Sequence, residues 1–196
     1  MSIADDMLAF LIGAVTGAAL VAGRRREGSA AFRDEGQVGS HWGSAGSGIL
    51  WFTYVSGTGP FVLLLHRSSS VNEPHTWGIP GGAVPVDDET GEPMDSYLSA
   101  MSENAEETGT PVGEMATSRW PEAEHVYRDE NSGFQFTTYL HQARRPFEPK
   151  LNWESDDHRW VSLREAKALP LHPGLARALP VLENKLAEVA NPHWDQ

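Results

Sequence analysis

The chain has 196 residues, 27 of them acidic and 15 basic, so its formal net charge at pH 7 is −12. Unless a local basic patch intervenes, this charge repels a polyanion, and we expect no duplex nucleic-acid partner. Clustered carboxylates, in contrast, suit hard divalent cations. The chain has no cysteine, which excludes disulfides, thiolate zinc sites and a cysteine nucleophile.

The N-terminal segment differs from the rest of the chain. Residues 7–23 carry no charge, include a G-x-x-x-G pattern at Gly13 and Gly17, and precede three arginines. Their number is near the lower limit of roughly 17–25 for a spanning helix. Two interpretations stay open: a membrane anchor that leaves the downstream domain in the cytoplasm, or a helix that packs on the domain or on a partner. We assign residues 1–27 to this apolar helix, 28–45 to a Gly- and Ser-rich linker, and 46–190 to one domain.

Beyond the linker, hydrophobic periodicity and turn residues predict a series of strands and helices. A Gly-rich loop at 56–60 separates the first two strands, and Gly109 and Pro111 end the central helix. Strands before and after a central helix, with helices closing the chain, indicate a mixed α/β layered domain. The expected strands, in chain order, cover 48–54, 61–66, 77–82, 124–128, 133–142 and 158–162, and the expected helices cover 94–108, a stretch from 163, and 173–189.

The helix over 94–108 carries the chemistry that we expect. Its apolar side chains fall on one arc of a helical wheel, and three glutamates fall on the opposite side: Glu103, Glu106 and Glu107. Such crowded carboxylates repel one another, and a divalent cation turns that repulsion into coordination. A solvated acidic face is the alternative. Upstream, Gly81 and Gly82 allow a backbone to approach a ligand closely, which favours a cradle for phosphate and metal.

Several motifs occur in a recognisable order. Gly82 opens a spaced pattern, and residues 102–110, Ser-Glu-Asn-Ala-Glu-Glu-Thr-Gly-Thr, close it. The flanking segments Leu-Leu-Leu-His-Arg at 63–67, Trp-Gly-Ile-Pro-Gly-Gly at 77–82 and Leu-His-Pro-Gly at 171–174 fit the same pattern. Together, over residues 42–189, they resemble the Nudix hydrolase family, whose signature is G-x5-E-x7-R-E-U-x-E-E-x-G-U with U apolar.

The chain departs from that signature in its loop and at three positions of the closing half. Glu92 matches the first glutamate, but nine residues separate it from Gly82 and nine more from Ser102. Ser102 occupies the position of the arginine that orients a catalytic glutamate in the family. Asn104 and Thr110 occupy apolar positions. We predict that Ser102→Arg leaves turnover equal or higher; a sharp drop would make the serine part of an altered site.

The resemblance implies an α/β/α sandwich with a mixed sheet and metal-dependent hydrolysis of a diphosphate linkage, in which water attacks phosphorus. It implies Mg²⁺ or Mn²⁺ held by Glu103 and Glu107, with Glu106 contributing directly or through water, and the carbonyl of Gly81 or Gly82 completing the shell. The general base would be Glu107 or Glu103, or else a loop glutamate, with Glu154 ahead of Glu130. Expected substrate contacts are Arg67, Gly81 and Gly82.

A second hypothesis keeps the scaffold but not the reaction. Without the signature arginine, the domain could bind a nucleotide and not turn it over. In either case the expected partner is a nucleotide-like small molecule in the cytoplasm. Family substrates include oxidised nucleoside triphosphates, ADP-ribose, dinucleoside polyphosphates and capped RNA ends. Dimers are common in the family, so a homodimer is one expected arrangement.

Overall fold

The computed structural model describes residues 45–55 and 59–190. The chain separates into two units, residues 1–41 and 42–196, and every described residue belongs to the second. The expected N-terminal helix over 1–27 lies outside the described residues, as does the linker except for Ala45, and both stay predictions. Within the described part of the chain, no helix is long and apolar enough to cross a membrane.

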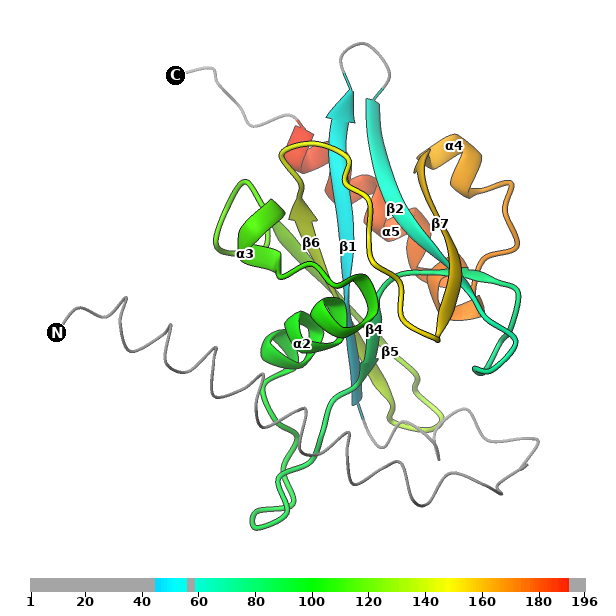
Figure 1. Cartoon of the computed structure of the whole chain (residues 1–196). Helices are drawn as coiled ribbons and strands as arrows, with labels where there is room; N and C mark the ends of the chain where they lie inside the picture. Colours follow the sequence, from blue (N-terminus) through cyan, green and yellow to red (C-terminus); the bar gives the residue numbers. More distant parts are fainter. Residues whose placement is uncertain (1–44, 56–58, 191–196) are drawn as a thin grey trace, which may run out of the picture. The chain divides into compact units, whose positions relative to one another are not determined.

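The described strands form one mixed sheet of seven strands (Figure 1). Its main path runs β3-β2-β1-β6-β5, with β4 pairing with β1 and β7 with β2. The β1–β6 pairing is parallel, and the other pairings between these strands are antiparallel. The strands are β1 (Ala45–Val55), β2 (Gly59–Arg67), β3 (Trp77–Gly78), β4 (Gly81–Ala83), β5 (Ala123–Arg128), β6 (Gln135–Gln142) and β7 (Ser155–Ser162).

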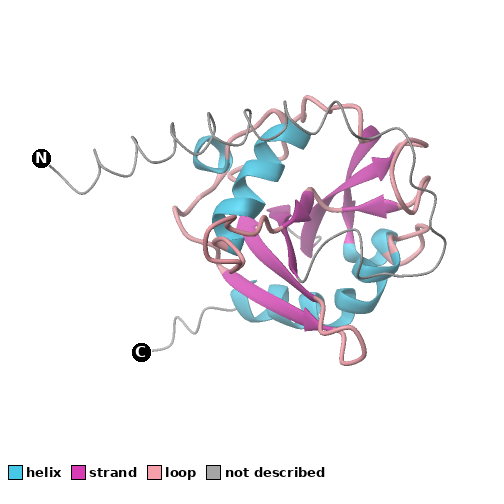
Figure 2. Cartoon of the chain, turned by 90° about the horizontal axis from the view of Figure 1, so that it is seen from below, coloured by secondary structure: helices cyan, strands magenta, loops and turns pink. Residues whose placement is uncertain are grey.

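Helices cover both faces of this sheet (Figures 1 and 2). Because successive side chains of a strand point to opposite faces, β1 contributes to two cores. Ile49 and Trp51 pack in the cluster that contains Ala100 of α2, while Leu50 and Phe52 pack in the cluster with the leucines of α5. The predicted α/β/α sandwich is therefore confirmed. The helices are α2 (Ser96–Thr108), α3 (Val112–Met115), α4 (Leu163–Ala166) and α5 (Pro173–Ala190).

The closing helix buries the side chains that its periodicity predicted. Leu175, Leu179, Leu182 and Leu186 of α5 are all buried, and Leu175, Leu182 and Leu186 belong to the core cluster that includes strand residues of the sheet. Burying a side chain of this size contributes about 1.5–3 kcal/mol, so this row holds α5 in place. The four-residue helix α3 was not predicted, because a single turn after Pro111 has no periodicity to detect.

The central helix differs from its prediction at its start and in its buried face. It begins at Ser96 because Asp95 caps it, and Met94 lies outside it, 54% exposed. Its buried residues are Ala100, Asn104, Glu107 and Thr108. Tyr97 and Met101 of the apolar arc are only partly buried against the core. The reason is that polar groups from distant segments meet this face: Asn104 Oδ1 accepts a bond from the Trp51 indole, 2.7 Å away.

Candidate active site

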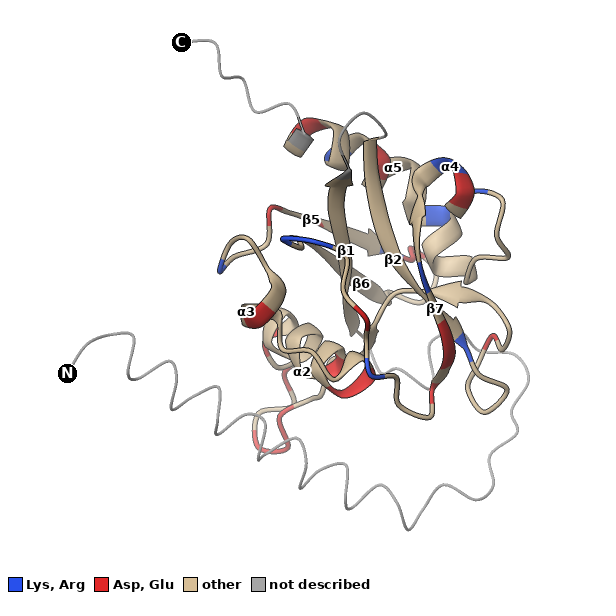
Figure 3. Cartoon of the chain, turned by 45° about the horizontal axis from the view of Figure 1, so that its top comes forward, with Lys and Arg blue, Asp and Glu red and all other residues tan. Residues whose placement is uncertain are grey.

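The site lies where the Gly81–Gly82 backbone meets the C-terminal half of α2. The N–H of Gly81 donates to Glu107 Oε1 over 2.7 Å. A Cβ added to Gly82 would overlap the carboxylate of Glu103, so only a residue without a side chain allows this approach. The two glycines and two of the three helix glutamates that the sequence singled out are thus brought together, with the acidic end of α2 visible in Figure 3.

Glu107 is the most unusual ionisable group of this site. It is 5% exposed, and a buried carboxylate is costly to ionise. Burial raises the pKa of the Glu107 carboxyl well above its usual range; Glu154 and Glu103 raise it further, while Gly81 and Arg67 oppose the rise. A carboxylate held under these conditions is typical of a functional site.

Two other carboxylates extend the cluster. Glu154, half-buried just before β7, acts on Glu107, and Glu106 acts in turn on Glu154. Burial raises the pKa of Glu154, Arg67 opposes that rise and Glu106 adds to it. Glu106 itself is exposed and accepts a long bond, 3.4 Å, from Ser102 Oγ. The four glutamates therefore form a connected set of like charges.

Arg67 lies at the end of β2 and reaches this set. Its Nε and Nη2 both donate to the carbonyl of Asn72, over 2.8 and 2.6 Å. Burial lowers the pKa of the Arg67 guanidinium, and Glu107, Glu154 and Glu73 oppose the fall. The arginine is therefore partly buried, and its side chain is bonded to Asn72 and not to the carboxylates. A contact with substrate phosphate stays a prediction.

The donor set suits a hard cation, although its present geometry is not that of a complete site. Carboxylate oxygens are the preferred ligands of Mg²⁺ and Mn²⁺, and mutual repulsion among the glutamates would be relieved by such an ion. Among the described residues, no three His, Asp or Glu side chains stand together as a metal-holding group. A cation bound here would therefore require some of these side chains to rearrange.

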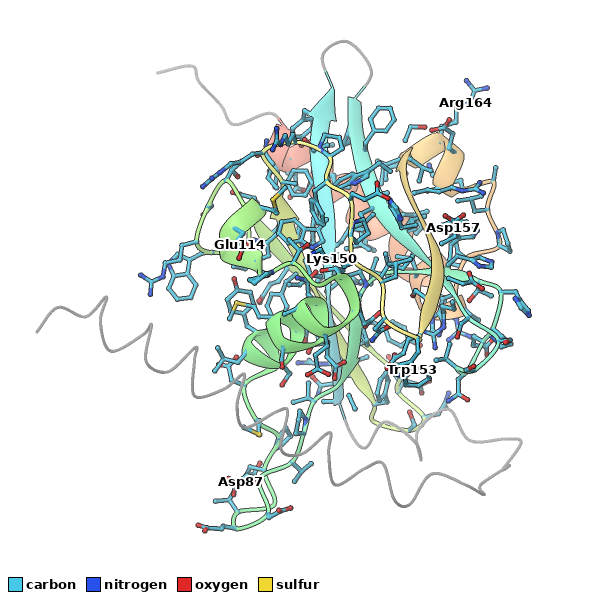
Figure 4. All side chains as sticks on the ribbon, in the orientation of Figure 1. Asp87, Glu114, Lys150, Trp153, Asp157 and Arg164 are labelled. Atoms are coloured by element: carbon cyan, nitrogen blue, oxygen red, sulfur yellow. The ribbon has the colours of Figure 1, made fainter. Side chains whose placement is uncertain are left out.

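Two of the departures from the signature, at Asn104 and Glu92, can be located in the structure. Asn104, in an apolar signature position, is fully buried, and its Nδ2 donates to the Thr110 carbonyl in addition to the bond that Oδ1 accepts from Trp51. Glu92, the proposed counterpart of the first signature glutamate, lies exposed in a loop whose tip, at Asp87, projects away from the sheet (Figure 4). The structure does not bring Glu92 to the other glutamates.

The segment between β6 and β7 closes over the end of α2, and the sequence did not reveal it. The N–H groups of Lys150 and Asn152 donate to the carbonyls of Thr108 and Glu107, and Figure 4 shows Lys150 and Trp153 on this segment. Trp153, 65% exposed, directly precedes Glu154. The one feature of the sequence that could have drawn attention to this segment is the tryptophan beside the glutamate in Asn-Trp-Glu-Ser, residues 152–155.

A separate hollow of about 250 Å³ lies at the opposite end of α2, lined by residues such as Met94 and Ser96. It includes none of the predicted site residues. Glu130, the second choice for a loop base, is exposed in the turn between β5 and β6 and is not among the groups that act on Glu107.

Comparison with known proteins agrees with this geometry. Residues 48–182 match the model of the NUDIX domain. A Mycobacterium tuberculosis protein described as "Putative 8-oxo-dGTP diphosphatase 3" is 30% identical over 163 residues, which cover 80% of this chain and 70% of that protein. A Bifidobacterium longum fusion of a nucleoside triphosphate pyrophosphatase and a Nudix hydrolase is 31% identical, over 76% of this chain and 30% of the fusion.

Solved structures share the fold. The Nudix hydrolase RenU of M. smegmatis superposes with a TM-score of 0.58 at 28% identity, covering 78% of this chain and 89% of RenU. An Ap4A hydrolase of C. elegans superposes with a TM-score of 0.54 at 20% identity, over 72% of this chain and 98% of that chain. The fold, the site and the similarity to these proteins together define a class of protein: hydrolases whose site is formed by a glycine turn and a carboxylate-bearing helix. This chain belongs to the Nudix family and is a Nudix hydrolase.

Proposed function

We propose that this enzyme hydrolyses a diphosphate linkage in a nucleotide-like substrate, with Mg²⁺ or Mn²⁺ bound at the acidic end of α2. The observation that carries the proposal is Glu107, a buried carboxylate fixed by the N–H of Gly81 among three other glutamates. If α2 presented only a solvated acidic face, the Glu107 side chain would be exposed to water, whereas Glu107 is only 5% exposed.

Each residue has a defined part in the proposed reaction. Glu103 and Glu107, with Glu106 and the Gly82 carbonyl, would hold the cation. When bound, the metal would neutralise diphosphate oxygens and stabilise the charge that develops at phosphorus. The backbone of Gly81 and Gly82 would let the substrate come close, because no side chain projects there.

Glu154 is our choice for the general base. The sequence alone favoured Glu107 or Glu103, but Glu107 Oε1 already accepts a bond from Gly81, and both residues are needed for the cation. Glu154 is half-buried beside Glu107, and a carboxylate whose pKa is raised accepts a proton from water more readily. Removal of a general base typically costs about 10²–10⁴-fold in rate, so Glu154→Gln should lower kcat by that factor.

A substrate panel with Mg²⁺ or Mn²⁺ tests the reaction. The first pair of compounds to compare is 8-oxo-dGTP and dGTP, because the M. tuberculosis relative is described as a putative 8-oxo-dGTP diphosphatase. ADP-ribose and a dinucleoside polyphosphate follow. We expect turnover of at least one compound, with release of a nucleoside monophosphate or of phosphate. Glu107→Gln should lower kcat by about 100-fold, the upper end of the range of about 10–100-fold seen even for groups that only orient a metal ligand. Glu114→Gln, an exposed glutamate of α3, should change kcat little.

The same panel separates the enzyme from the binding module that the missing arginine suggested. Equilibrium binding of each compound is measured beside turnover. Tight binding without turnover, under both metals, would establish a binding module and refute the proposed hydrolysis. Equal activity of the wild type and Glu107→Gln would refute the site assignment.

A further inference from the structure

Trp153 is the most exposed of the large apolar side chains that the structure describes. It is 65% exposed, although the large apolar ring of a tryptophan gains stability by leaving water. Within residues 45–55 and 59–190, its indole has neither a hydrogen bond nor an aromatic-ring contact. Single exposed apolar residues are common on protein surfaces, so the position of Trp153 decides what it can do.

The backbone on both sides of Trp153 is bonded to the elements that form the active site. The N–H of Asn152 donates to the carbonyl of Glu107 over 3.3 Å. The carbonyl of Glu154 accepts from the N–H of Ser68, just after β2, over 2.8 Å, and the N–H of Glu154 donates to Asn152 Oδ1 over 2.9 Å. Figure 4 shows Trp153 beside the start of β7. The indole is therefore carried by a fixed turn, and not by a free loop.

The residues next to this indole are those assigned to the reaction. Glu154, the proposed base, follows it in the chain, and Asn152 before it is bonded to the backbone of Glu107, a proposed metal ligand. A diphosphate held among these groups would have its nucleoside only a few bonds away. Stacking on a base needs no positive charge, and aromatic side chains stack on bases of every kind. Such a contact suits an acidic site that has to bind an anion.

The other strongly exposed tryptophan has different surroundings. Trp120, between α3 and β5, is 58% exposed. The guanidinium of Arg119 lies over its ring, 5.6 Å from the centroid, and the ring of Tyr97 is 6.2 Å away. Trp120 thus has partners within the chain, and none of these is a residue assigned to the reaction. It provides a matched control for Trp153.

We propose that Trp153 is a specificity-determining residue of this site, whose indole stacks on the base of the substrate. This inference rests on the proposed function and limits its substrate class to compounds that carry a nucleobase. A compound with the same phosphate and no base would lack the contact. Because stacking tolerates every base, Trp153 selects for the presence of a base and not for one particular base.

Equilibrium binding of guanosine monophosphate and of ribose 5-phosphate, each with Mg²⁺, tests the proposal without turnover. The two probes share a sugar phosphate and differ in the base. We expect Trp153→Leu to weaken binding of guanosine monophosphate about 5–150-fold, the loss of one base–aromatic stack, and to leave binding of ribose 5-phosphate unchanged. Trp153→Phe, which keeps a flat ring, should lose less. Trp120→Leu should change neither affinity.

Steady-state kinetics and thermal unfolding give two further readouts. With a nucleotide that the wild type turns over, Trp153→Leu should raise KM and leave kcat within about twofold, because the base is bound equally in the ground state and the transition state. A fall in kcat with unchanged KM would overturn the stacking role. Because the side chain is exposed, Tm should stay within about 2 °C of the wild type.

The outcomes distinguish this inference from the proposed function. Equal weakening of both probes in Trp153→Leu, or wild-type affinity for guanosine monophosphate no higher than for ribose 5-phosphate, would overturn the role of Trp153. A similar loss in Trp120→Leu would do the same. Absence of turnover in the wild type with every compound would refute the proposed function, while the binding comparison would still decide whether a base stacks on Trp153.

Discussion

Gly82 is constrained by a side chain that belongs to the site. The position that its Cβ would occupy is filled by the end of the Glu103 side chain, whereas a Cβ on Gly81 would meet the backbone of Ser47 and Gly48. A flexible carboxylate can move aside at little cost, but a backbone cannot. The two glycines therefore differ in what a methyl group would disturb.

We predict that Gly82→Ala lowers kcat at least about 10-fold by displacing Glu103, while Tm changes by less than about 2 °C. Gly81→Ala should lower Tm markedly. Kinetics and thermal unfolding of both variants check this, with Gly113→Ala as control, since nothing lies near its Cβ position. An active Gly82→Ala would show that Glu103 does not need its present position.

Asn104 shows how one polar residue fits an apolar position of the signature. Its side chain satisfies the indole N–H of Trp51, which is itself fully buried. We predict that Asn104→Leu lowers the free energy of unfolding by about 1–3 kcal/mol, because a buried donor loses its acceptor. Urea denaturation measures the change. In a Trp51→Phe background the loss should be smaller, and an equal loss would mean that this bond is not the cause.

At the scale of elements, α2 is placed by its two ends. Asp95 Oδ1 accepts bonds from the N–H groups of Tyr97 and Leu98 over 2.8 and 2.9 Å, and Gly109 ends the helix in the left-handed conformation, φ 61°. These caps satisfy backbone groups that a helix leaves unpaired. They fix the helix so that its last turns present the glutamates to Gly81 and Gly82.

Removing the N-terminal cap should weaken the fold more than the chemistry. We expect Asp95→Ala to lower the free energy of unfolding by about 1 kcal/mol, with kcat nearly unchanged, because Asp95 lies three turns from Glu106. Chemical denaturation and kinetics check this. Asp88→Ala, in the exposed loop before the helix, should change neither the free energy of unfolding nor kcat. A comparable loss of stability in this variant would contradict the capping explanation.

At the scale of the whole molecule, the buried Glu107 makes stability depend on pH. Its pKa is raised on folding, chiefly by burial, so the folded chain binds the proton more tightly than the unfolded chain. The contribution of this group to stability therefore falls as pH rises above the ordinary value of 4.5 toward the raised pKa. Burial of the Glu107 carboxylate, which the proposed metal site requires, therefore lowers the free energy of unfolding at neutral pH.

We predict that, with metal chelated, Glu107→Gln becomes more stable relative to the wild type as pH rises from 4.5 to 8. Each unit by which the pKa is raised contributes about 1.4 kcal/mol. Urea denaturation at several pH values measures the difference. Saturating Mg²⁺ should stabilise the wild type more than the variant, and equal stabilisation would argue against Glu107 as a metal ligand.

The sequence by itself determined most of the elements and their order, but not α3 and not the division of the expected strand 77–82 into β3 and β4. Apolar, β-favouring runs on either side of a Gly-rich loop predicted β1 and β2, the leucine spacing predicted the buried row of α5, and Gly109 marked the end of α2, because these signals are local. The order of Gly82 and the three glutamates, together with the flanking motifs, was enough to indicate the family.

Only the tertiary structure decided which face of α2 is buried and which groups surround Glu107. The residues that set that face, Trp51 and Gly81, lie 53 and 26 positions from their partners on the helix. Helical periodicity reports the polarity of a helix's own side chains and not the groups that other segments bring to it.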